Sequence, residues 1–405
     1  MFYAEQHGVN LFSSRLYYPA PGVSLAELAP YRRAVSPDGD VCAMAVDLSE
    51  DIEALREISR KSGRPRIGWL CICAPFELIH AAGLDSFFVR GRGEFEKESS
   101  AHLSVFACSH LRKTLNEAIR GSISLDGVMG VASCEGMRRH FEIWTRSARP
   151  RFAFLLDMPR VDSPASRHYL CQKIESAARE IERAYDVRLT KRSIAKAVRD
   201  LNHLRAALRR LDGLRAARPG AISNRDFYEL VLLAMESPPA AASAVVDSAC
   251  DRISRSRSKK EPAILLAISG NIVDDIAVFK AFDDVGAIAV FDDLCIGNRF
   301  FSVLDMDAAS PLESVANRIF DSFTCARSLN EKSKLKQFAS EAKKRGSTAI
   351  ALVSQINCDA ALIEQAKIAQ EAERLGFKVL SVLLDGGLRS YGIREKFKEF
   401  AEMIA

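Results

Sequence analysis

Residues 131–144 read VASCEGMRRHFEIW, an apolar run that stops at Cys134 and is followed by a helical pattern. Upstream, SLDGVMGVAS (124–133) predicts a turn and then a short buried strand. Downstream, three large apolar residues recur at the spacing of one helix face, namely Met137, Phe141 and Trp144. The stretch therefore predicts a strand that passes to a helix at Cys134. In an open α/β sheet this is the carboxyl edge, where ligands bind.

The same arrangement recurs near the other end of the chain, in GSTAIALVSQINCDAALIEQAKIAQEAERLGFKVLSVLLD (346–385). Cys134 is followed by Glu135 and Cys358 by Asp359, and a predicted helix follows each pair. A free cysteine is most often simply buried. Two cysteines in the same local setting instead indicate two similar α/β units that face one shared site, where the helix dipole favours a thiolate.

The composition is that of a globular protein with more than one domain: 405 residues, 48% hydrophobic and 27% charged. The net charge is only +5, and the Arg-rich run within 164–250 is interpreted as a solvated helical face, so we expect no nucleic-acid partner. No apolar run approaches the ~18 residues of a membrane span, and no signal peptide is evident. We therefore expect a cytoplasmic protein with no membrane partner.

Ten cysteines in a cytoplasmic chain should be reduced, so the alternatives are packing, metal binding and redox use. Only Cys71 and Cys73 are close in sequence, and one CxC without a second pair is a poor zinc signature. The chain contains no P-loop, dinucleotide fingerprint, GxSxG elbow or HExxH helix. Any nucleotide-driven step would therefore need another protein.

The pattern predicts an α/β fold with two doubly wound parallel-sheet domains, Rossmann- or flavodoxin-like, joined by a helical segment. Four segments are predicted. Residues 1–64 form an irregular and helical layer packed on the first sheet, and residues 65–162 form the first α/β domain. Residues 163–260 form a helical segment with a linker, and residues 261–405 form the second α/β domain. The first sheet has strands predicted near 66–72, 86–89, 127–133 and 151–156. In the second domain a helix is predicted over 272–286.

Three cysteines, Cys108, Cys134 and Cys358, each stand at the start of a predicted helix. Cys108 and Cys134 are separated by one helix and one strand, so both can reach the same sheet edge. Three thiolates around one cleft leave one corner of a four-iron cluster unfilled. An open iron is a Lewis acid as well as an electron carrier.

Five segments resemble, in order, the 2-hydroxyacyl-CoA dehydratase and benzoyl-CoA reductase family, with the D-component type of iron–sulfur subunit as the nearest pattern. They are PFELIHAAG (75–83), ACSHLRKTLNEAIRGSISLDGVMGVASCEGMRRHFEIW (107–144), LDMPR (156–160), VFDDLCIGNR (290–299) and NCDAALIEQAKIAQEAERLGFKVLSVLLD (357–385). The resemblance runs from about residue 65 to the C-terminus. After Cys108 the family pattern has Pro and an apolar residue, whereas this chain has Ser109 and His110.

The resemblance implies a [4Fe-4S] cluster held by Cys108, Cys134 and Cys358. It also implies a homologous second subunit, as a heterodimer or homodimer, and a separate ATP-dependent iron–sulfur activator. The implied reaction is that of a hydro-lyase of anaerobic metabolism, which removes water from a 2-hydroxyacyl-CoA thioester by a one-electron ketyl-radical route. A benzoyl-CoA reductase-like subunit and a non-catalytic scaffold or electron-relay subunit are the alternatives.

Other residues carry two interpretations each. Glu77 lies at the start of the PFELIHAAG helix and either faces substrate as a catalytic group or interacts with backbone amides. Cys71 is the reserve cluster ligand, followed by Cys295 and Cys325, with core packing as the alternative. His110 is either a proton donor or a surface histidine. Packing alone is expected of Cys42, Cys171 and Cys250.

Overall fold

The computed structural model describes residues 45–60, 63–91, 97–256, 264–304, 308–322, 325–328, 331–384 and 390–404. Most of the predicted N-terminal layer, with Cys42, lies outside these residues, and so does the end of the basic linker. All element bounds below refer to the described parts of the chain.

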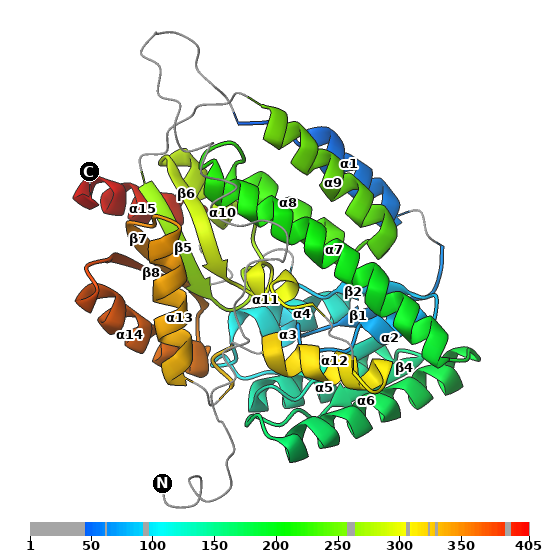
Figure 1. Ribbon diagram of the computed structural model, residues 1–405. Coiled ribbons are helices and arrows are strands. Elements are labelled where there is room, and N and C mark those ends of the chain that lie inside the picture. Colours follow the sequence, from blue (N-terminus) through cyan, green and yellow to red (C-terminus); the bar gives the residue numbers. More distant parts are fainter. Residues whose placement is uncertain are drawn as a thin grey trace, which may run out of the picture.

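Two four-stranded parallel sheets form the frame of the molecule, as predicted (Figure 1). Their strand orders are equivalent, β2-β1-β3-β4 and β6-β5-β7-β8. In both, the first strand is central and the order reverses beside it, as in flavodoxin-like folds. The strands are β1 (Arg66–Trp69), β2 (Asp85–Phe88), β3 (Gly127–Val131), β4 (Phe152–Leu156), β5 (Ile264–Gly270), β6 (Ala287–Asp293), β7 (Ala349–Gln355) and β8 (Lys378–Leu384).

Two strands of the first sheet end earlier than predicted. β1 ends at Trp69, because the chain then bends into a turn in which the N–H of Ala74 donates to Cys71 O at 2.9 Å. β3 ends at Val131. Cys71 and Cys134 therefore stand in loops beyond the carboxyl ends of neighbouring strands.

Helices cover both faces of the first sheet, since alternate residues of a strand point to opposite faces. Leu70 and Val128 pack against α4 and α5, whereas Trp69 and Met129 belong to the larger core on the other face. The helices of this unit are α2 (Glu77–Ala81), α3 (Lys97–Ser100), α4 (Ser109–Arg120) and α5 (Glu135–Ala148).

The second sheet is covered in the same way. Ala267 and Ile350 pack with residues of α13 and α14, and Leu266 and Ala351 face the larger core. The helix predicted over 272–286 is shorter, because its first turn begins where the N–H of Ala277 donates to the Asp275 carboxylate at 2.9 Å. The helices are α10 (Ala277–Asp284), α11 (Asn298–Phe301), α12 (Pro311–Ser322), α13 (Glu331–Lys344), α14 (Asp359–Arg374) and α15 (Ser390–Ile404).

The helical segment lies between the two units, with α7 along the middle of the molecule (Figure 1). The prediction that its Arg-rich run is a solvated face is wrong for Arg205 and Arg215, which are 0% and 1% exposed. Both are buried because they pair with carboxylates, Arg205 with Glu77 and Arg215 with Asp292. The helices are α6 (Pro164–Tyr185), α7 (Lys191–Ala217), α8 (Asn224–Met235) and α9 (Pro239–Arg255).

Helix α1 (Ser49–Arg60) is correctly predicted, but its packing is not. It lies against α8 and α9 rather than against the first sheet (Figure 1). Its apolar stripe, with Ile52 and Leu55, enters the main core, and Arg56 forms an ion pair with Glu229 of α8. The prediction that the N-terminal layer packs on the first sheet is therefore wrong for this helix.

Candidate functional site

Cys108 and Cys134 each stand directly before a helix. They are the N-cap residues of α4 and α5, and both have extended backbone. The N–H of Met137 donates to the Cys134 sulfur at 3.3 Å. An N-cap side chain lies over the free amides of the first helical turn, which favour negative charge. Backbone amides of the first helical turn are therefore available to a sulfur ligand at this position.

Cys358 is the N-cap residue of α14 and is brought to its position by a tight turn. Asn357 has a φ of 60°, the left-handed conformation that asparagine tolerates better than most residues. Its Nδ2 donates to Val105 O at 3.2 Å, which ties this turn to the segment before Cys108. The Arg327 Nη2 donates to the Cys358 sulfur at 3.5 Å.

The three thiols share one neighbourhood, although they come from two α/β units. Cys108 as a residue is partly exposed, but the pKa of its thiol is raised to about 12, chiefly by burial, with contributions from the charges of Cys358 and Cys134. Such effects require the thiols to lie near one another. The structure thus brings together the three side chains singled out from the sequence, while their role as ligands stays a prediction.

The three cysteines have the donor chemistry of an iron–sulfur cluster, because thiolates hold such clusters. No three His, Cys, Asp or Glu side chains in the described ranges stand close enough to hold one metal ion. A four-iron cluster needs wider spacing, because each thiolate binds a different iron. Three thiols at helix N-termini with an arginine beside them suit an anionic cluster of this kind.

Beside Cys108, the first turn of α4 is fastened to the second unit. Ser109 Oγ donates to Leu384 O at 3.0 Å and to the Gln355 side chain, and His110 Nδ1 lies 3.3 Å from Asp274 Oδ2. The interpretation of His110 as a surface histidine is wrong, because only 4% of it is exposed. We call this the rim contact: Ser109, His110 and Lys113 of α4 with Asp274, Gln355 and Leu384 of the second unit.

Asp274 is the charged centre of the rim contact. Its burial alone would raise its pKa, but the hydrogen bond with His110 and the charge of Lys113 lower the pKa below the usual value. Lys113 Nζ lies 3.7 Å from Asp274 Oδ1. Asp274 is therefore a carboxylate that holds α4 against the loop after β5. Sequence reasoning missed it, because Asp274 belongs to none of the motifs.

Glu77 forms a second contact between the units, which we call the core contact. The carboxylate is 0% exposed and accepts hydrogen bonds from Arg205 Nη2 at 2.6 Å and from Arg318 Nη2 at 3.0 Å. Burial alone would raise its pKa, but the charges of Arg318 and Arg205 lower it. The geometry thus gives Glu77 a structural role, and its role toward substrate stays a prediction. A lone arginine on an apolar helix face was the only sequence signal for Arg205.

The reserve cysteines Cys71, Cys295 and Cys325, together with Cys73, stand in the segments after β1, β6 and α12, and we call these four residues the second cysteine group. Cys73 and Cys295 are buried, and Cys71 and Cys325 are partly exposed. Cys250 instead lies inside the core, its sulfur 3.8 Å from Ala207 O. Cys171 is partly exposed on α6.

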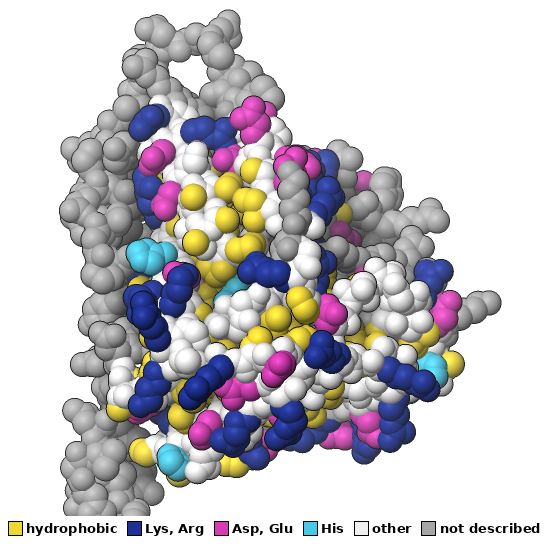
Figure 2. Space-filling view, turned by 90° about the vertical axis from the view of Figure 1, so that its right-hand side faces the viewer, with side chains coloured by type: hydrophobic (Ala, Val, Ile, Leu, Met, Phe, Trp, Pro, Cys, Tyr) yellow, Lys and Arg dark blue, Asp and Glu magenta, His cyan; other side chains and the backbone are white. Residues whose placement is uncertain are grey.

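On the face in Figure 2, Lys and Arg side chains are interspersed with Asp and Glu side chains. Pairs such as Arg179 with Glu175 and Lys196 with Asp200 place opposite charges one helical turn apart on α6 and α7. This is the charge pattern of a solvated helical face. Within the described ranges, no helix has the length and apolar character needed to cross a membrane.

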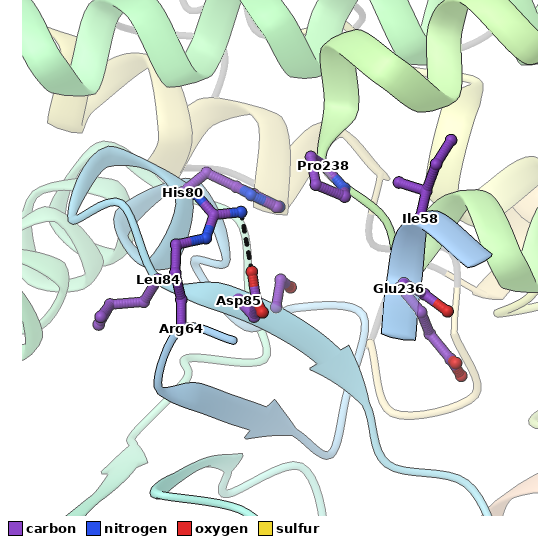
Figure 3. A pocket seen from close by; sticks show the side chains of 9 residues that line it. Ile58, Arg64, His80, Leu84, Asp85, Glu236 and Pro238 are labelled. Carbon is purple, nitrogen blue, oxygen red and sulfur yellow. Dashed lines mark ion pairs between the residues drawn. The ribbon is translucent and has the colours of Figure 1, made fainter. Parts of the chain in front are cut away.

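The cavity in Figure 3 lies near β2, and the ion pair of Arg64 with Asp85, 2.9 Å long, stands at its wall beside His80. It encloses about 10 Å³, roughly the room of one water molecule. A groove of about 490 Å³ along the start of α7 is lined by polar residues such as Arg192 and Lys196. No cysteine lines either one, so neither supports a site at the thiols.

The chain is similar to known proteins over most of its length. The family model for the 2-hydroxyglutaryl-CoA dehydratase D-component matches residues 71–404. The (R)-phenyllactyl-CoA dehydratase beta subunit of Clostridium sporogenes is 21% identical over 350 residues, 85% of this chain and 93% of that protein. A benzoyl-CoA reductase subunit of Thauera aromatica is 19% identical over 378 residues, which cover 90% of this chain and 98% of that subunit. The beta subunit of lactoyl-CoA dehydratase of Anaerotignum propionicum is 20% identical over 357 residues, which cover 87% of this chain and 95% of that subunit. Because the family model spans most of its length, the chain belongs to the 2-hydroxyglutaryl-CoA dehydratase D-component family.

Proposed function

We propose that this chain is the iron–sulfur subunit of a CoA-thioester dehydratase and helps to remove water from a 2-hydroxyacyl-CoA. The observation that carries the proposal is the meeting of three N-cap cysteines, Cys108, Cys134 and Cys358, from two α/β units. The family and the dehydratase subunits similar to this chain support the same function.

The three cysteines would hold a [4Fe-4S] cluster and leave one iron without a protein thiolate. When bound, this cluster would supply one-electron chemistry and a Lewis-acid position at the open iron. Arg327 beside Cys358 and the free amides of α4, α5 and α14 would offset the negative charge. The rim contact would hold α4, and with it Cys108, against the second unit.

The chemistry explains why an electron is needed. In a 2-hydroxyacyl thioester the proton to be removed lies β to the carbonyl and is too weakly acidic for ordinary base catalysis, which motivates a one-electron ketyl-radical route. Glu77 does not supply a strong base, since two arginines hold its carboxylate. A separate ATP-dependent activator is proposed as the electron source, because the sequence has no phosphate-binding loop.

The relatives named above are subunits, so we also propose a homologous partner subunit and a CoA-thioester substrate shared with it. A cytoplasmic location belongs to this proposal. A reductive function is the second candidate, because the benzoyl-CoA reductase subunit of Thauera aromatica aligns over 98% of its length. A scaffold or electron-relay subunit is the third.

The test is anaerobic purification followed by iron and sulfide analysis. The wild-type chain should be brown, and Cys134→Ser should lose about four iron ions per chain, the content of one cubane. Cys171→Ser is the matched control, because Cys171 lies outside both cysteine groups, and it should keep its iron. A colourless, iron-free wild-type chain with a stable fold would overturn the proposal, and full retention of iron in Cys134→Ser would reject that ligand.

A further inference from the structure

Cys134 and Cys358 differ in the group that donates a hydrogen bond to the sulfur. The Cys134 sulfur accepts from a backbone amide of its own helix, the N–H of Met137, at 3.3 Å. Cys358 also caps a helix, but its side chain accepts no hydrogen bond from the amides of α14. Its sulfur instead accepts from Arg327 Nη2 at 3.5 Å. A charged side chain thus takes the place that a helix amide has at Cys134.

The backbone explains this difference. Cys134 is extended, with φ −153° and ψ 167°, the conformation in which an N-cap side chain reaches the amides of the first turn. Cys358 has φ −94° and ψ 79° and follows the left-handed Asn357. The tight turn therefore takes the Cys358 sulfur off the first turn of α14, and a donor from another segment supplies its hydrogen bond.

Arg327 comes from a short turn after α12. The N–H of Ser328 donates to Cys325 O at 2.9 Å, which closes this turn around Arg327. Arg327 is half-buried. Partial removal from water strengthens the interaction between a cation and an acceptor in hydrogen-bond contact. The guanidinium is therefore placed to act on the Cys358 sulfur.

Arg299 shows that contact with a cysteine does not by itself direct an arginine's charge to sulfur. Arg299 Nη1 donates to the Cys295 sulfur at 3.6 Å. However, both carboxylate oxygens of Asp293 accept from the same guanidinium, each at 2.8 Å, so a carboxylate already balances its charge. The charge of Arg299 is therefore used mainly to hold the loop after β6.

The charge of Arg327 is directed to thiols. Burial lowers the pKa of Arg327, whereas the charges of Cys134, Cys358 and Cys325 raise it, as does the hydrogen bond to Cys358. Two of these three cysteines belong to the site proposed for the cluster. This agrees with the hydrogen bond, which identifies the Cys358 sulfur as the point of contact.

We propose that Arg327 is a positioning residue that raises the reduction potential of the cluster through its hydrogen bond to the Cys358 sulfur. The inference rests on the proposed function and adds the residue that sets how readily the electron from the activator is accepted. One added electron makes the cluster more negative by one charge. A charged donor at a ligand sulfur stabilises this more negative state.

The test is a redox titration of the anaerobically purified, iron-loaded chain, followed by electron paramagnetic resonance. Arg327→Gln removes the charge and should lower the equilibrium constant for reduction at least about tenfold, a shift of about 59 mV or more to lower potential for one electron. Arg327→Lys keeps the charge without the planar fork and should lie between Arg327→Gln and the wild type. Arg179→Gln removes an exposed arginine of α6 and is the control for net charge, so its potential should match the wild type.

The outcomes separate this claim from the proposed function. A brown wild type whose potential is unchanged in Arg327→Gln would overturn the role of Arg327 and leave the proposed function intact. An iron-free wild type would overturn both. If Arg327→Gln binds no cluster, Arg327→Lys decides, because a potential below that of the wild type supports the hydrogen bond and an equal one rejects it.

A second measurement uses the wild type alone and does not depend on the folding of variants. The chain is labelled with the heavy nitrogen isotope in its arginines, loaded with iron and sulfide, and reduced. Pulsed electron paramagnetic resonance should then detect hyperfine coupling between the paramagnetic cluster and a labelled nitrogen. A loaded wild type without this coupling would overturn the proposal.

Discussion

The core contact and the rim contact both join the two α/β units, but their chemistry differs. In the core contact, the fully buried Glu77 is held by two arginines at 2.6 and 3.0 Å. In the rim contact, Asp274 is held by His110 at 3.3 Å and Lys113 at 3.7 Å. The core contact thus concentrates opposite full charges at short range, whereas the ion pairs of the rim contact are longer.

This difference predicts a different role for each contact. The core contact lies between α2, α7 and α12, so it sets how the units pack. The rim contact lies at the first turn of α4 and at the ends of β7 and β8, beside Cys108 and Cys358. A change in the core contact should act on stability, and a change in the rim contact should act on the placement of the cysteines.

Removal of Glu77 is expected to have the largest effect. Glu77→Ala leaves Arg205 and Arg318 buried without their carboxylate, which should lower the free energy of unfolding by about 3–5 kcal/mol. The measurement is urea unfolding of the metal-free chain. Glu175→Ala, which removes an exposed ion pair with Arg179, is the control and should cost less than about 1 kcal/mol. Equal losses in both variants would contradict the core contact.

Asp274→Asn should have a smaller effect on stability and a specific effect on iron. The neutral amide no longer balances Lys113 and His110, so we expect a loss of about 1–3 kcal/mol. Because α4 carries Cys108, the variant should also release iron faster than the wild type during anaerobic dialysis. Asp200→Asn, at an exposed pair on α7, is the control. If the variant loses stability but retains iron as well as the wild type does, the rim contact does not position the cysteines.

Acid should weaken the side of the molecule that carries the rim contact. His140 of α5 is fully buried against Thr114 of α4, and burial, together with the charge of His110, lowers its pKa to about 3. The unfolded chain takes up this proton near pH 6.5. Stability should therefore fall as the pH drops from about 6.5 to about 3, by at most about 1.4 kcal/mol per pH unit.

The measurement is the free energy of unfolding against pH. His140→Gln cannot titrate, so its curve should lack this part of the slope, whereas replacement of the exposed His168 by Gln should leave the slope unchanged. If the slope of the wild type persists in His140→Gln, another group is responsible for the acid sensitivity.

Much of the fold could be predicted from local patterns. Helix α4 begins directly after Cys108, as predicted, and both sheets are parallel. These features depend on short-range chemistry: apolar runs of strand length, apolar spacing on helix faces, and glycine after a helix, as at Gly121 with its φ of 66°. Strand ends were harder to predict, since Trp69 ends β1 only because of the turn that follows.

The charged contacts could not be predicted in the same way. Arg205 and Arg215 resemble the exposed arginines around them in sequence, yet they are buried, because their partners Glu77 and Asp292 come from distant segments. Asp274 likewise acquires its partners only when α4 meets the loop after β5. Apart from the apolar helix face on which Arg205 stands, pairing over such distances leaves no local pattern.

The sequence by itself determined the element types, the parallel sheets and the helix-start positions of Cys108, Cys134 and Cys358, because these follow from local spacing and chain order. The tertiary structure decided that thiols from both units meet and that Glu77 and Asp292 pair with arginines of distant segments. The physical reason is that proximity between distant segments depends on how two sheets pack around α7, which no single stretch of the chain encodes.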